Sequence, residues 1–410
     1  MSFKWAVINS FTGNSSSPAL TNYRLCPVCG SMNSRIVLEL GNFQFFSDSC
    51  HYPKRVNLRQ NQCCNCFTLY LNPCYSEFGY KVLFEEAGQS YVSDGSSRHK
   101  EQIEWLKNRR FLKGKARAMD VGCYDGRFLA QMPGNISKIG VDIDKRAIDS
   151  GRQKFAEANI EFICGDFESF QNNKPPDIIT MFHVLEHLQK PLSVLSNLRK
   201  VSKDTTKLVV EVPILENSET NNINGFFSVQ HMTHFSKSTL KNCLARAGWQ
   251  IIEWDEQTGY NGCRIIAVPS VSTTAIEVNA HDIFLNLNYL SNWYKWLGEA
   301  ELKFEACKAT KRFIIWGGGL HTEFIYQTTS FFHVDPARKY LIVDSDTMKR
   351  GKSWRGIHIF SPSVLSKLNW ADKKIVISSY GNQNEIEKSA IEMGVPPECI
   401  VKLYDEVRVY

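Results

Sequence analysis

No run in this 410-residue sequence approaches the ~18 consecutive apolar residues that mark a membrane-spanning helix. Its first residues also lack a basic stretch followed by an apolar core, which is the pattern of a secretory leader. Lys and Arg form no dense block, and a net charge of +6 is mild for this length, so nucleic acid is not the expected partner. We therefore expect a cytoplasmic protein with no membrane and no nucleic acid partner; its oligomeric state is left open.

The thirteen cysteines do not indicate a disulfide scaffold, because such scaffolds are short and secreted. Cys26 with Cys29, and Cys63 with Cys66, form a CxxC…CxxC pair. Thiolates at positions i and i+3 of a tight turn can face one ion, and two such turns supply a tetrahedral set. The spacing predicts a structural Zn²⁺ site with these four ligands, Cys64 being an alternative to Cys63. The competing interpretation is free cysteines in the core or on the surface.

Strand-like and helix-like stretches alternate over much of the chain, which predicts an α/β fold with a doubly wound, Rossmann-like parallel sheet. The apolar runs are 116–122, 138–143, 160–166, 177–184, 207–213 and 264–269. A second, smaller alternation follows at 312–319, 340–346, 357–360 and 373–379. Between them, residues 275–311 contain no Pro or Gly except Gly298 and show helical periodicity, which indicates a connecting helix or helix pair.

A glycine turn from Gly122 to Gly126 follows the first run of the larger unit. Asp120 ends that strand, Asp142 ends the next one, where a carboxylate can accept both ribose hydroxyls, and Asp166 follows the third, within reach of an adenine amino group. This series predicts an S-adenosylmethionine (SAM) site. Two alternatives remain: NAD, although the third glycine of GxGxxG is missing, and simple strand-end caps. The candidate cofactor residues are Asp120, Gly122, Tyr124, Gly126, Asp142, Ile143, Asp166, Phe167 and His183.

Methyl transfer from a sulfonium needs in-line positioning and, for most acceptors, removal of a proton. His183 and His187 flank the end of the fourth strand in the segment HVLEH, where Glu186 could orient one of them. His231 and His234 precede an expected helix, and each is either a site residue or a packed core histidine. We take His231, Glu186, His187 and Tyr91 as the catalytic candidates.

The order of these motifs resembles the nucleotide-sugar C-methyltransferase family within the class I SAM-dependent methyltransferases. The resemblance covers about residues 24–405 and rests on the CxxC…CxxC module, GCYDG, HVLEH, the EVP strand and the second α/β unit. It implies that the metal module and the C-terminal unit help to enclose a deoxysugar nucleotide, and that a carbon next to a ketone is methylated.

The resemblance also makes His231 the general base, because it falls on the last residue of the family's Tyr-His-Glu-His segment. Ser228, Val229 and Gln230 replace the other three residues of that segment. A lone histidine base suits a hydroxyl acceptor equally well. The expected substrate-binding residues are His234, Tyr260, Asn261, Gly317, Gly319, His321 and Asp344.

The smaller unit repeats the pattern of strand, glycine turn and helix start at Gly317–Gly319, and Asp344 ends its next strand. A helix start of this kind can hold a phosphate through free backbone N–H groups. Three interpretations of this unit remain: it binds the acceptor's nucleotide, it binds NAD, or it binds no ligand. The resemblance favours the first.

Together these observations predict an enzyme of five segments: a flexible N-terminus (1–23), a zinc-binding module and connection (24–97), a SAM-binding methyltransferase domain (98–270), a helical connector (271–311) and a C-terminal Rossmann-like domain (312–410). The predicted function is methyl transfer to carbon or oxygen of a nucleotide-linked sugar or a related carbohydrate precursor. The alternatives are an O-methyltransferase of a glycan or secondary metabolite, and a non-catalytic partner protein that binds NAD or SAM.

Overall fold

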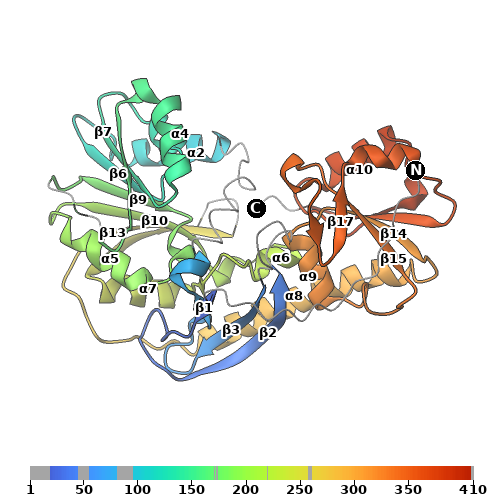
Figure 1. Ribbon diagram of the computed structural model, residues 1–410. Helices are drawn as coiled ribbons and strands as arrows, with labels where there is room; N and C mark the ends of the chain where they lie inside the picture. Colours follow the sequence, from blue (N-terminus) through green and yellow to red (C-terminus); the bar gives the residue numbers. More distant parts are fainter. Residues whose placement is uncertain are drawn as a thin grey trace.

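The computed structural model describes residues 19–44, 55–80, 96–169, 171, 174–218, 220–256 and 261–407. Two α/β lobes lie side by side, with a smaller β-sheet below them and a long helix running beneath both (Figure 1). Among the described residues, no helix combines the length and apolar content needed to cross a bilayer.

The larger lobe contains a seven-stranded sheet in the order β12-β13-β10-β9-β6-β7-β8. The strands from β10 to β8 are parallel, whereas β13 is antiparallel to both β10 and β12. The expected doubly wound sheet is thus mostly parallel, and β12 is a strand that the sequence interpretation missed. The strands are β6 (Arg117–Val121), β7 (Ser137–Asp142), β8 (Ile160–Cys164), β9 (Ile178–Phe182), β10 (Lys207–Pro213), β12 (Trp249–Asp255) and β13 (Gly262–Pro269).

Two helices of this lobe, α4 and α7, begin with side-chain caps. Asp144 caps α4 by accepting hydrogen bonds from the backbone N–H groups of Arg146 and Ala147. Ser236 and Thr239 form a reciprocal capping box at the start of α7. The helical elements are α2 (Ser96–Asn108), α3 (Arg127–Ala130), α4 (Lys145–Lys154), η1 (Ala156–Ala158), η2 (Leu185–His187), α5 (Pro191–Lys200), η3 (Leu215–Asn217), α6 (Ile223–Phe226) and α7 (Lys237–Arg246).

The N-terminal module is built on a four-stranded antiparallel sheet in the order β11-β4-β3-β2. Its last strand, β11, comes from the segment that carries His231, so the module and the methyltransferase lobe share a sheet. The strands of the module and its flanking pair are β1 (Thr21–Asn22), β2 (Ser34–Gln44), β3 (Arg55–Cys63), β4 (Leu69–Leu71), β5 (Cys74–Tyr75) and β11 (Thr233–His234).

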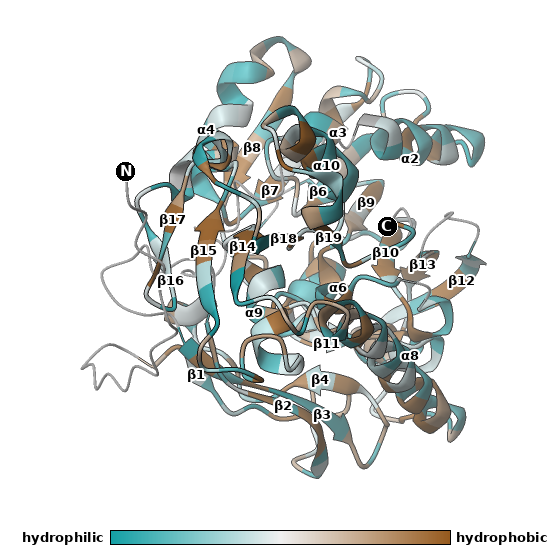
Figure 2. Ribbon diagram, turned by 90° about the vertical axis from the view of Figure 1, so that its right-hand side faces the viewer, coloured by the Kyte–Doolittle hydropathy of each residue, from teal (hydrophilic) through white to brown (hydrophobic). Residues whose placement is uncertain are grey.

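The C-terminal lobe is the expected second Rossmann-like unit, with the strand order β16-β17-β15-β14-β18-β19. It follows α8 (His281–Glu305), a single helix. In Figure 2 the strands of both lobes are hydrophobic inside more polar helices. The elements are β14 (Arg312–Trp316), α9 (Leu320–Thr328), β15 (Lys339–Val343), η4 (Thr347–Lys349), β16 (Ser353–Trp354), β17 (Ile357–Phe360), η5 (Pro362–Lys367), β18 (Lys373–Ile377), α10 (Gln383–Glu392), η6 (Pro397–Cys399) and β19 (Ile400–Lys402).

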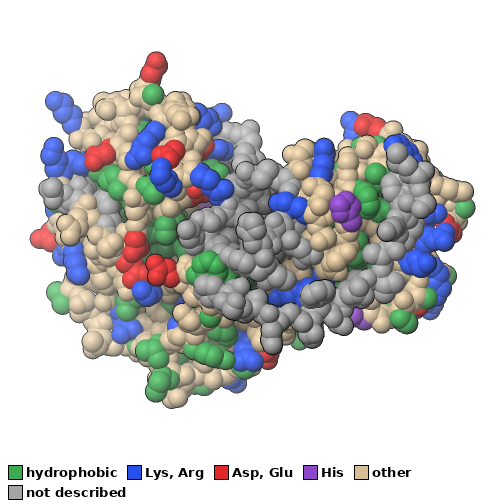
Figure 3. All heavy atoms as spheres, in the orientation of Figure 1, with side chains coloured by type: hydrophobic (Ala, Val, Ile, Leu, Met, Phe, Trp, Pro, Cys, Tyr) green, Lys and Arg blue, Asp and Glu red, His purple; other side chains and the backbone are tan. Residues whose placement is uncertain are grey.

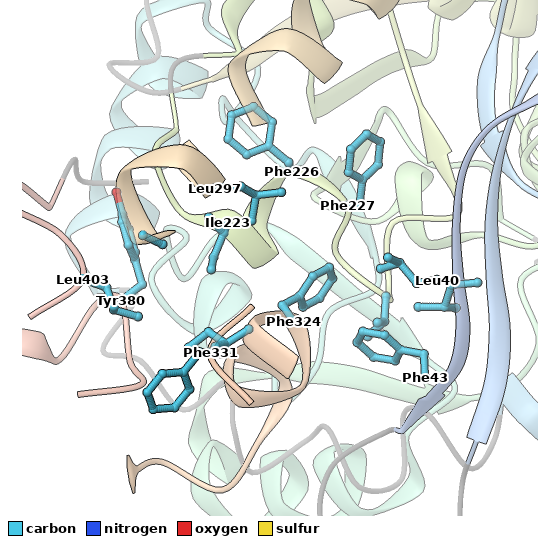
Figure 4. Packing of buried hydrophobic residues seen from close by; sticks show 14 of the residues in the cluster. Leu40, Phe43, Ile223, Phe226, Phe227, Leu297, Phe324, Phe331, Tyr380 and Leu403 are labelled. Carbon is cyan, nitrogen blue, oxygen red and sulfur yellow. The ribbon is translucent and has the colours of Figure 1, made fainter. Parts of the chain in front are cut away.

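One hydrophobic cluster joins the N-terminal sheet, the segment after β10, helix α8 and the C-terminal lobe. In Figure 4 Phe43 of β2, Phe226 of α6, Leu297 of α8 and Phe324 of α9 all point into it. Because apolar area removed from water is the main source of stability, this shared core fixes the units against one another. Figure 3 shows Lys and Arg interspersed with Asp and Glu on this face instead of gathered in one basic patch.

Candidate active site

The four predicted zinc ligands come together on two turns. Their sulfur atoms all lie within 4.8 Å of one another, with 3.6 Å between Cys26 and Cys66 and 3.4 Å between Cys29 and Cys63. A tetrahedral ion with bonds of ~2.3 Å holds its sulfur ligands ~3.8 Å apart, so this set fits such an ion. Cys64 is exposed and lies outside the cluster, which removes it as an alternative to Cys63.

The glycine turn is built by protein packing. Gly122 and Gly126 have φ values of 78° and 77°, which non-glycine residues rarely adopt. A Cβ on Gly122 would lie 2.3 Å from the Val184 side chain, and one on Gly126 would lie 2.4 Å from the Phe162 ring. A glycine without a Cβ can make room for a ligand that comes close to the backbone. Among the described residues, what a Cβ would meet is the protein itself, and Val184 of the HVLEH segment is the neighbour that packs on the turn.

Asp142 holds the turn from the next strand. Its carboxylate accepts hydrogen bonds from the backbone N–H groups of Tyr124 (2.8 Å) and Asp144 (2.9 Å). Burial raises the pKa of Asp142, while these N–H groups favour the ionised form. The following residue, Ile143, is 47% exposed although it is apolar, as expected for a side chain that covers a ligand ring.

Asp120 lies deeper, at the end of β6. Its carboxylate accepts a 2.6 Å hydrogen bond from the Thr180 hydroxyl, and burial raises its pKa to about 7. Asp166 is exposed and accepts a hydrogen bond from the backbone N–H of Glu168. Phe167 is buried in the core of the lobe, away from solvent. Of these three, Asp166 has the accessibility that a direct ligand contact requires.

Tyr80 was missed by the sequence analysis. Burial raises the pKa of its hydroxyl, and the charges of Asp142 and Asp166 raise it further, so Tyr80 lies within electrostatic range of these two predicted cofactor residues. Its position just before residues 81–95, which include Tyr91, gives no motif that could have identified it. Tyr91 and Tyr260, two of the predicted site residues, lie outside the described residues.

A buried chain of charges underlies the HVLEH segment. His183 has φ 54° and lies between two carboxylates, 3.3 Å from Glu186 and 3.2 Å from Glu211. Burial acts to lower the pKa of His183, but the two carboxylates raise it to about 9. Glu211 of β10 also pairs with Arg264 of β13 at 2.5 Å. His183 is therefore an imidazolium that joins two acids, and the sequence analysis missed Glu211 and Arg264.

Glu186 lies close to the candidate residues His187 and His231. Only 2% of it is exposed, and neither carboxylate oxygen accepts a hydrogen bond of good geometry from the described residues. Although burial opposes ionisation, the neighbouring histidines His187 and His183 lower the pKa of Glu186 to about 2. Ligand atoms of Glu186, His187 and His231 lie within 4.8 Å of one another. A cation could fit there, but His183 already balances the charge of Glu186.

His231 stands at the centre of this cluster. Its ring packs edge to face on His187, with 4.8 Å between ring centroids, and His187 is oriented through Nδ1 by the Gln230 carbonyl at 3.0 Å. Burial lowers the pKa of His231 well below its usual value. The ring is therefore neutral at pH 7, which is the form that can accept a proton.

A cavity of about 20 Å³ lies beside His231, with room for about one water-sized group. Besides the two carboxylate oxygens of Glu186, three polar atoms of the cavity's lining residues have no hydrogen-bond partner among the described residues: Thr233 Oγ1, His234 Nε2 and Asn261 Oδ1. Burial lowers the pKa of His234 to about 4, so it too is neutral. The predicted residues His231, His234 and Asn261 are thus brought together, with unused hydrogen-bonding capacity for a polar ligand.

The candidates in the C-terminal lobe are engaged with the protein itself. His321 is buried between the Ser378 hydroxyl (3.0 Å) and the Tyr404 hydroxyl (2.5 Å). Asp344 accepts from the backbone N–H of Gly318 at 2.8 Å and pairs with Lys349 at 3.1 Å. A Cβ on Gly317 would meet the Ser378 backbone at 2.5 Å, whereas one on Gly319 would meet only the Lys349 amine at 3.3 Å. Gly319 is therefore the more open of these two glycines, with the Lys349 amine of η4 beside it.

The comparison with known proteins agrees with the fold of the larger lobe. Residues 97–253, less than half of the chain, match the family model described as a methyltransferase domain. The sheet order and the glycine turn agree with this match, so residues 97–253 are similar to a methyltransferase domain. A search of curated proteins finds no match.

Solved structures of low identity resemble about half of the chain. A magnesium protoporphyrin IX methyltransferase from Synechocystis PCC 6803 is 17% identical over 47% of this chain and 95% of its own, with a TM-score of 0.36. An N-methyltransferase from Bradyrhizobium japonicum is 14% identical over 45% and 97%, also at 0.36. A complex of a Haloferax volcanii methyltransferase activator with a putative methyltransferase gives 13% identity over 46% and 98%, at 0.37. We draw no conclusion about the substrate from these similarities.

Proposed function

We propose that this protein transfers the methyl group of SAM to a nucleotide-linked sugar or a related carbohydrate precursor. The observation that carries the proposal is the position of the Glu186–His187–His231 cluster. It follows the carboxyl end of β9, and in an α/β sheet ligands bind in the crevice at those ends. The cofactor turn after β6 contacts the same segment through Val184.

His231 is the proposed general base. A neutral imidazole takes the acceptor's proton, and the ionised Glu186 beside it stabilises the imidazolium that forms, as a carboxylate does for histidine in hydrolase triads. Gln230 stands where the resembled family has its glutamate, so Glu186 supplies a carboxylate from another element. SAM supplies the methyl group as a sulfonium, Asp142 would hold its ribose, and Asp166 and Ile143 would contact its adenine.

Zn²⁺ is proposed for the four cysteines, in a structural role, because four thiolates close the coordination sphere. The C-terminal lobe is proposed to hold the acceptor's nucleotide near Gly319 and Lys349. Support for this comes from the cation beside an open glycine turn and from the family resemblance.

Incubation with methyl-labelled SAM and a set of nucleotide-linked keto-deoxysugars tests the proposal, with mass spectrometry of the products. We expect one labelled methyl group on the sugar. Absence of methylated sugar from every nucleotide tested would reject the acceptor class.

Exchange in D₂O separates carbon from oxygen methylation. Deuterium appears at the carbon beside the ketone if His231 forms an enolate, and that exchange disappears in His231→Ala. A labelled methyl group on a hydroxyl, without such exchange, would establish O-methylation instead.

A further inference from the structure

Arg24 precedes the first cysteine of the metal cluster by two positions and reaches out of the N-terminal module. Its guanidinium packs against the Tyr70 ring, with 5.6 Å to the ring centroid, and its Nε donates to the Leu71 carbonyl at 3.1 Å. Its own backbone N–H donates to the Asn72 side chain at 3.0 Å. The module thereby fixes both the backbone and the inner edge of this arginine.

The outer edge of Arg24 contacts two separate segments of the methyltransferase lobe. Nη1 donates to the Gln189 carbonyl at 2.6 Å, and Nη2 donates to the Met232 carbonyl at 2.6 Å. Gln189 lies two residues after His187, and Met232 follows His231 directly. One guanidinium therefore fixes the backbone beside each of the two histidines whose rings pack edge to face.

These two segments also contact each other, so that Arg24 closes a ring of interactions. The Met232 N–H donates to the Glu186 carbonyl at 2.8 Å, and the His187 ring meets the Gln230 carbonyl at 3.0 Å. Met232 also accepts from the Leu71 N–H at 2.9 Å, which joins the ring to the sheet of the module.

We propose that Arg24 is a positioning residue, which sets the relative placement of His187 and His231 from the metal-binding module. The inference rests on the proposed role of His231. The planar fork of arginine suits this task, because it donates to two carbonyls at a fixed separation, which a lysine ammonium does not reproduce. Hydrogen bonds from a charged donor are also stronger than neutral ones.

Arg24→Gln is compared with Arg24→Lys and with a matched control, Arg246→Gln. Arg246, at the end of α7, also joins the lobe to the module by donating to the Val28 carbonyl, but it contacts neither histidine segment in the described structure. The protein is labelled with ¹³C-histidine, and its NMR spectrum is recorded. The His187 and His231 signals are assigned with variants in which one histidine is replaced at a time. Metal content and SAM affinity are measured on each variant.

We expect Arg24→Gln to shift the His187 and His231 signals, with unchanged metal content and SAM affinity, and to lower kcat at least about tenfold. Arg24→Lys should recover part of kcat, and Arg246→Gln should move neither signal. The proposal is overturned if both signals stay in place, or if Arg246→Gln moves them equally.

The histidine spectra need no acceptor, so they are independent of the proposed function. If no sugar is methylated but the two signals still move in Arg24→Gln, the proposed function fails and the positioning role stands. If methylation occurs and Arg24→Gln retains full kcat with unmoved signals, the positioning role fails alone.

Discussion

At the scale of single residues, the site depends on charges that are buried but balanced. Glu211 is fully buried and meets Arg264, and Glu186 is balanced by the imidazolium of His183. Because removing one member of a buried pair leaves an uncompensated charge, each of these residues matters for stability. His231 and His234 are neutral, and we assign the proton transfer to His231 because it contacts His187 and lies beside Glu186.

Replacement of His231 by Ala should lower kcat by about 10²-fold or more, the usual contribution of a general base, while calorimetry shows unchanged SAM binding. His281→Ala is the control, because His281 is exposed at the start of α8. Full turnover in His231→Ala would remove this residue as the base.

The charge on His183 predicts how stability depends on pH. Its folded pKa is raised from 6.5 to about 9, so its contribution is fully present below pH ~6.5 and is lost as the pH rises through 9. Urea unfolding at pH 7 and pH 9.5 should therefore show a loss on the order of a few kcal/mol in the wild type. His183→Gln should have a lower unfolding free energy than the wild type at pH 7. It should also lose less of that free energy between pH 7 and pH 9.5. An equal loss in both proteins would contradict the assigned charge.

At the scale of elements, the glycine turn joins the cofactor strand to the HVLEH segment. Gly122→Ala combines a positive φ with a contact of 2.3 Å to Val184, so we expect a loss of about 2 kcal/mol or more in unfolding free energy and weaker SAM binding. Gly134→Ala is the control, because nothing lies within 4 Å of its Cβ position, and it should change stability by less than ~0.5 kcal/mol. Urea unfolding of the two variants measures the difference, and equal stability would show that the turn is not strained by a Cβ.

The strands and turns of both lobes could be predicted, because apolar runs and glycines are local signals. Strand β12 was missed because its burial alternates only partly, which leaves a weak periodic signal, although it pairs with the next strand along the chain, β13. The grouping of Glu186, His187 and His231 required two segments 44 positions apart to meet, as the His187–His231 contact shows. Glu211 and Arg264 carried a usable signal, since each is a charged residue inside an apolar strand, and they pair directly across β10 and β13.

At the scale of the whole molecule, the segment between β10 and α7 is where the units meet. It contributes β11 to the N-terminal sheet, packs α6 on α8, and joins the C-terminal lobe through Asn221, which accepts from the Tyr380 hydroxyl at 2.5 Å. The segment that carries His231 is thus held by the N-terminal sheet, by α8 and by the C-terminal lobe.

Metal analysis should find one Zn²⁺ per chain, which is lost in Cys26→Ser and kept in Cys64→Ser, because only Cys26 belongs to the four-sulfur cluster. Loss of the ion should also lower the unfolding temperature, since a structural zinc contributes folding energy directly. Equal zinc content in the two variants would contradict the assigned ligands.

The central claim, that the larger lobe acts with SAM, is tested most directly by isothermal titration calorimetry with SAM, its demethylated product and NAD. The account predicts that the first two bind and NAD does not, and that Asp142→Asn weakens both at least about tenfold because a charged acceptor is lost from the ribose contact. Asp204→Asn, at a carboxylate that is 93% exposed in the same lobe, should leave the affinities unchanged. Binding of NAD without binding of SAM would contradict the account.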